Sequence, residues 1–64
     1  MNKKEIKNLA KQIAKAELII QNSTDQKEKT YAMDTIIALS SKLSSLEEME
    51  RVDEMVQKIL ENNS

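Results

Sequence analysis

The 64-residue chain contains no cysteine, histidine, glycine or proline, and Tyr31 is its one aromatic residue. Without cysteine and histidine, the chain can form neither a disulfide nor a conventional zinc site. The lack of cysteine also fits a reducing compartment, so we expect a cytoplasmic protein. Without glycine and proline, the tight turns that join β-strands are disfavoured. The composition therefore favours helices connected by polar turns.

Longer patterns are missing as well. No apolar run approaches the ~20 residues that a membrane-spanning helix needs, and no signal-peptide apolar stretch follows the basic start of the chain. No nucleophile–base pair, glycine-rich phosphate loop or EF-hand spacing occurs. We therefore expect a non-enzymatic protein without a metal or cofactor, and no association with a membrane.

The small size of the chain has its own consequence. A domain of this length buries a marginal core and is usually supported by disulfides, metals, oligomerisation or very regular helix packing. Since the first two are excluded, the sequence predicts one all-α domain over residues 1–64. We expect two to three amphipathic helices that form a helical hairpin or a small three-helix bundle, completed by homo-oligomerisation.

Three amphipathic segments can be recognised, over residues 3–21, 24–43 and 45–61. Their apolar residues recur with spacings of three and four, which is the period of one helix face. The main stripes consist of Ile6, Leu9, Ile13, Ala16 and Ile20 in the first segment, Ala32, Ile36, Leu39 and Leu43 in the second, and Met49, Val52, Val56 and Ile59 in the third.

Serine-rich boundaries separate the segments. Ser23 with Gln26 is a candidate capping box at the start of the second segment, and Ser44 with Glu47, or Ser45 with Glu48, is a candidate at the start of the third. Because serine alone does not break a helix, one long bent helix over residues 24–60 is the competing prediction. The spacing favours three helices.

Several apolar residues exceed what one packing partner requires. On a helical wheel, Leu18 and Ile19 fall toward the lysine side of the first segment, and the apolar arc of the third segment covers roughly half of its circumference. We expect these excess residues to form a subunit interface in a homo-oligomer. They are Leu18, Ile19, Leu46, Met49, Met55 and Leu60.

Lysines form one face of the first segment. Lys4, Lys7, Lys11 and Lys15 fall within ~80° on the wheel, and the third segment is predominantly acidic. This basic surface could track phosphates, contact an acidic partner protein or attract the acidic third segment. It lacks arginine and interleaved aromatic residues, and the net charge of the chain is -1, which argues against duplex nucleic acid as the partner.

Tyr31 lies off the apolar stripe of the second segment. Lys27, Thr35 and Lys42 share its side of the wheel, so this group could bind a flat anionic ligand, with a base stacked on the ring and phosphates near the ammonium groups. The alternative is a tyrosine packed at a helix boundary with its hydroxyl group in water.

At the level of class, the chain is similar to the small helical proteins encoded by phages and plasmids. That likeness implies either binding and modulation of a host protein or sequestration of a small nucleotide, and no residue role is transferred from it. The leading hypothesis is a homo-oligomeric interaction protein that binds a host protein. The alternatives are an oligomeric protein that binds small nucleotides and a nucleic-acid-binding regulator.

Overall fold

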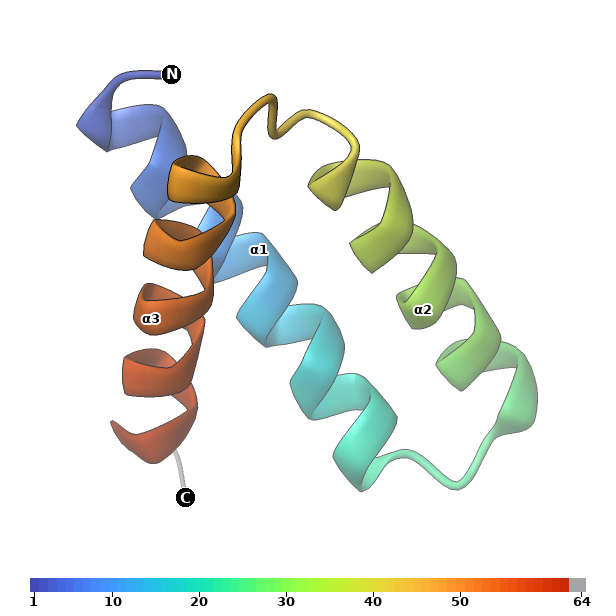
Figure 1. The fold of residues 1–64 in the computed structure, drawn as a ribbon. Coiled ribbons are helices and arrows are strands. Elements are labelled where there is room, and N and C mark those ends of the chain that lie inside the picture. The colour runs from blue at the N-terminus through green and yellow to red at the C-terminus, as the bar shows by residue number, and fades with distance from the viewer. Residues whose placement is uncertain (63–64) are drawn as a thin grey trace.

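The computed structural model describes residues 1–62, which fold into three α-helices. Helix α1 spans Lys3–Asn22, α2 spans Gln26–Ser40 and α3 spans Leu46–Asn62 (Figure 1). The prediction of an all-helical fold is confirmed, and residues 41–45 separate α2 from α3, so the alternative of one long bent helix is wrong.

Helix α1 forms where the stripe of alternating three- and four-residue spacings lies. It begins at Lys3 after Asn2, whose side chain accepts a hydrogen bond from the Glu5 N–H at 2.8 Å and so satisfies one of the free donors of the first turn. Its apolar stripe is buried from Ile6 to Ala16 and partly buried at Ile20, and the neighbouring Ala10 and Ala14 are 0% and 1% exposed. These short side chains allow both neighbouring helices to approach α1 closely.

The start of α2 differs from the predicted capping box. Asp25 is the N-cap, because its carboxylate accepts the Lys27 N–H at 2.9 Å. The Ser23 hydroxyl instead accepts from the Asp25 N–H at 3.1 Å and donates to Glu28 at 3.2 Å, so it shapes the turn before the cap. The helix therefore begins at Gln26 rather than at residue 24.

The serine-rich segment after α2 is a helix boundary, as the sequence predicts. The α-helix ends at Ser40, and tighter turns follow, with the Leu43 N–H donating to the Ser40 carbonyl at 3.1 Å. This explains why the periodic pattern continued to Leu43. Leu43 still packs against the core, but from the connection between the helices.

The start of α3 uses one of the two predicted serine–glutamate pairs. The Ser45 hydroxyl accepts the Glu48 N–H at 3.2 Å, while the Glu48 carboxylate accepts both the N–H and the hydroxyl of Ser44 at 3.0 Å. The return contact of the box thus reaches one residue further back than in the usual motif. The same carboxylate also accepts from the amino group of Met1.

The buried core is centred on α1. Its cluster combines one face of α1 with Leu39 of α2 and with Val52 and Val56 of α3. Partly buried apolar residues of the other two helices and their connection cover its edges, and they are Ile36, Leu43, Met55, Ile59 and Leu60.

The three helices leave one side of the bundle open. Helix α1 packs against both α2 and α3, whereas α2 and α3 hardly contact each other. Figure 1 shows α1 lying between the other two, with the start of the chain near the first turn of α3. The Cα trace measures 34 × 24 × 16 Å, so the bundle is flattened, and the missing α2–α3 interface leaves a groove above α1.

Candidate protein-interaction groove

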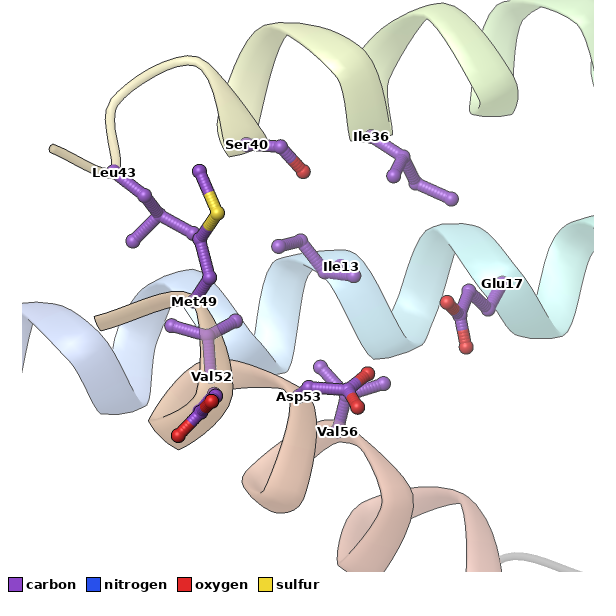
Figure 2. Close-up of a pocket in the computed structure, with 10 residues that line it drawn as sticks. Ile13, Glu17, Ile36, Ser40, Leu43, Met49, Val52, Asp53 and Val56 are labelled. Atoms are coloured by element: carbon purple, nitrogen blue, oxygen red, sulfur yellow. The ribbon is translucent and has the colours of Figure 1, made fainter. Parts of the chain in front are cut away.

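A groove lies between α2 and α3. It encloses about 410 Å³ and is open to solvent. In Figure 2, Ile13 and Glu17 of α1 form its floor, Ile36 and Ser40 of α2 line one side, and residues of α3 line the other. The α3 side consists of Met49, Glu50, Val52, Asp53 and Val56, and Leu43 lies at the end nearest the α2–α3 connection.

The lining is mainly apolar because each helix turns the edge of its apolar stripe toward the groove. On the α3 side, Val52 and Val56 are 3% and 2% exposed, whereas Met49 is 46% exposed. Methionine is flexible and adapts to differently shaped partners. The α3 side therefore combines two buried valines with one adaptable methionine.

Apolar residues continue beyond the groove. Met33 and Ile37 of α2 and Leu46 of α3 are 53%, 68% and 72% exposed. On the α2 wheel, Met33 and Ile37 lie next to Ile36, on the side away from Tyr31. Together these side chains extend the apolar surface at both walls, and extended apolar patches rimmed by polar groups are typical of interaction sites.

Three carboxylates accompany this apolar lining. Glu17 lies at the floor and is partly buried, while Glu50 and Asp53 are exposed along α3. No lysine or arginine lines the groove, and none of the three acids has an ion pair within residues 1–62. The groove thus carries negative charge on its α1 and α3 sides, and the α2 side offers only the Ser40 hydroxyl as a polar group.

Tyr31 lies on the opposite side of α2, where the residue is 76% exposed. Tyr31 and Thr35 line a shallow pocket of about 290 Å³ together with Gln12, Lys15, Ala16, Ile19 and Ala32. Lys27 and Lys42 do not line this pocket; the cation that does is Lys15 of α1. The Thr35 hydroxyl donates to the Tyr31 carbonyl at 2.9 Å, so it is already used within α2.

The lysines of the basic surface, Lys4, Lys7, Lys11 and Lys15, are all exposed on α1. Within residues 1–62, none of them forms an ion pair with the acidic α3. The two ion pairs found there join Met1 to Glu48 and Arg51 to Glu47. The basic surface and the groove therefore present opposite charges on different sides of the molecule.

The residues predicted for an oligomer interface lie in separate places. Leu18 and Ile19 are partly buried and line a pocket at the end of α1, and Met55 and Leu60 pack against the core. Leu46 and Met49 are exposed beside and inside the groove. Only this last pair belongs to the large apolar surface.

Sequence reasoning missed the groove as a site. Ile13, Val52 and Val56 show the ordinary spacing of core residues. The spacing within one helix cannot reveal that α2 and α3 hardly contact each other. Glu17 offered a signal, because a carboxylate at its position interrupts the apolar face of α1. On a helical wheel it lies only ~40° from Ile13.

Among the described residues, no helix has the length and apolar character needed to cross a membrane, and no group of three or more acidic side chains is arranged to hold a metal ion. Comparisons with protein-family models, curated proteins and solved structures find no match.

Proposed function

We propose that this protein is a small non-enzymatic interaction protein that binds and modulates a host protein by taking one of its helices into the groove between α2 and α3. The observation that carries the proposal is the open apolar groove above α1, with Ile13 at its floor and Ile36 and Met49 on opposite walls. An amphipathic helix that lays its apolar face in a groove is a common mode of recognition.

The binding energy would come mainly from apolar burial. A groove of about 410 Å³ accommodates several side chains of a partner helix, and the adaptable Met49 wall closes against them. Anchors in such interfaces dominate the affinity, so loss of one groove side chain weakens binding at least tenfold when it forms a central contact.

A pulldown from host lysate with matched variants tests this function. Met49→Gln changes an exposed groove residue, and Tyr31→Gln makes the same kind of change at an exposed residue on the opposite side of α2, outside the groove. We expect proteins that are retained by wild type and by Tyr31→Gln but lost with Met49→Gln, quantified by mass spectrometry. Identical retention by both variants contradicts the groove as the binding site.

Self-association is the competing use of the apolar surface, as the small core predicts. A second copy would cover Met33, Ile37, Leu46 and Met49. In a symmetric dimer, however, the same face meets itself, so Glu17, Glu50 and Asp53 of both copies would be brought together. Like charges across an interface oppose association. Sedimentation velocity from 1 to 100 μM protein distinguishes a partner from a second copy.

A small nucleotide is a second candidate ligand, at the pocket of Tyr31. What favours it is that the exposed ring and Lys15 line the same pocket, with Gln12 beside them. A base would stack on the ring while a phosphate meets the Lys15 ammonium group. Native mass spectrometry with a nucleotide mixture tests this, and Tyr31→Ala should abolish any bound nucleotide while leaving the helical content unchanged.

A further inference from the structure

The charge of the groove indicates the chemistry of its occupant. Among the ten lining residues, six are apolar, three are acidic and one is Ser40. The acids are not distributed evenly: Glu50 and Asp53 follow α3, Glu17 rises from α1, and the α2 wall has none. A helix placed in this groove would have one flank near carboxylates and the other near a neutral wall.

Within the described residues 1–62, none of these carboxylates forms an ion pair. The four lysines of the basic surface belong to α1 but are absent from the groove lining, and Arg51 pairs with Glu47 at 3.0 Å. Covering the groove with an apolar or acidic partner would remove water from Glu17 without supplying a counter-charge, which is unfavourable. A cationic flank would compensate that cost and speed encounter.

We propose, on the basis of the function proposed above, that the occupant is a basic amphipathic helix of a partner protein. Its apolar residues, spaced i, i+3 or i+4, and i+7, contact Ile13, Ile36 and Met49, and lysine or arginine lies on the flank that faces α3. Those cations meet Glu50 and Asp53 at the edge and Glu17 at the floor, while small or neutral polar residues face Ser40.

The placement of the charges also determines the direction in which the bound helix runs along the groove. Turning the helix end for end, with its apolar face still in the groove, would bring the cations to the neutral α2 wall and leave the acids without partners. Charge complementarity at an interface contributes specificity and association rate more than affinity. The acidic residues on the α3 side therefore supply specificity for the partner, and the apolar residues supply most of the affinity.

Three synthetic helical peptides test the proposal directly. They share one row of leucines at the spacing given above and differ at the flank, which carries lysine, glutamine or glutamate. Affinities are measured by fluorescence anisotropy at 50 and 300 mM salt. We expect the lysine peptide to bind at least tenfold more tightly than the glutamine peptide at low salt, the glutamate peptide to bind most weakly, and the differences to shrink at high salt.

Variants of the protein assign the effect to the groove. Glu50→Gln with Asp53→Asn should reduce the advantage of the lysine peptide to less than threefold. Glu54→Gln is the matched control, because this exposed acid of α3 does not line the groove. Circular dichroism verifies that each variant keeps its helical content.

The outcomes separate this inference from the function on which it rests. Equal binding of the lysine and glutamine peptides, abolished in both cases by Met49→Gln, overturns the basic helix but leaves a helix-binding groove. Absence of binding by all three peptides at 100 μM contradicts the groove function as well. A concentration-dependent dimer that is dissociated by none of the peptides identifies a second copy as the occupant and overturns the proposal.

Discussion

The amino group of Met1 donates a hydrogen bond to the carboxylate of Glu48 at 2.8 Å, across 47 residues of sequence. Glu48 also accepts from the N–H and the hydroxyl of Ser44, so one side chain joins the start of α1, the α2–α3 connection and the first turn of α3. These contacts lower the pKa of Glu48 from 4.5 to about 2, with the bond from the Met1 amino group as the largest cause.

The first prediction concerns stability in acid. Because the pKa of Glu48 is depressed in the folded state, its contribution is fully present above pH 4.5 and is lost as the pH falls toward about 2. Glu48→Gln should therefore be less stable than wild type at pH 7, and the gap should narrow below pH 4.5. Melting temperatures by circular dichroism between pH 7 and pH 2.5 measure this, with Glu54→Gln as the control. Parallel curves for Glu48→Gln and wild type would contradict it.

The second prediction concerns the chain start. The bond to Glu48 raises the pKa of the Met1 amino group above 8.0, so its contribution is present below pH 8 and is lost as the pH rises through the raised pKa. Acetylation of this amino group removes its charge at every pH. We expect the pKa of Glu48 to rise toward its ordinary value in the acetylated protein, followed by NMR titration of its side-chain carboxyl carbon. An unchanged titration would mean that the Ser44 contacts alone hold the pKa low.

The third prediction concerns the close approach of helices at α1. Ala14 is 1% exposed, so a larger side chain there must displace a neighbouring helix. Ala14→Leu should lower the free energy of unfolding by about 1–3 kcal/mol through overpacking. Urea denaturation provides the measurement. Ala38→Leu, on the exposed side of α2, should change the free energy of unfolding by less than about 0.5 kcal/mol. A comparable loss for both variants would argue against tight packing at Ala14.

The fourth prediction concerns the cap of α2. Removing the Asp25 carboxylate leaves the Lys27 N–H without its acceptor, so Asp25→Ala should cost about 1 kcal/mol of stability. Asp34→Ala, inside the same helix and exposed, should have the opposite sign, because alanine is the better helix former by a few tenths of a kcal/mol. Thermal unfolding at pH 7 compares the two. An equal loss of stability from Asp25→Ala and Asp34→Ala would contradict a capping role for Asp25.

The sequence predicts the helices well because each depends on local spacing. The stripe from Ile6 to Ala16 is buried where the pattern places it, and Val52 and Val56 are buried as well. Local spacing does not determine which residue is the N-cap of α2. Ser23, Thr24 and Asp25 can all cap a helix, but Ser23 ends α1 and its hydroxyl accepts from the Asp25 N–H, whereas the Asp25 carboxylate accepts from the Lys27 N–H.

Contacts between helices cannot be predicted from the spacing of residues within one helix. The cation that shares a pocket with Tyr31 is Lys15 of α1, whereas the α2 wheel brings Lys27 to the same side. The groove has the same origin, because Ile36 and Met49 line one groove only through the angle at which α2 and α3 pack on α1. Helix crossing angles depend on both surfaces together.

The separate packing of α2 and α3 on α1 leads us to expect that the two outer helices move independently. Because they hardly contact each other, opening of α2 from α1 should leave the α1–α3 interface intact, and the reverse should also hold. Hydrogen exchange should then report two opening events with different free energies rather than one. Independent movement would make the width of the groove adjustable, so the proposed partner helices could carry anchoring side chains of different sizes.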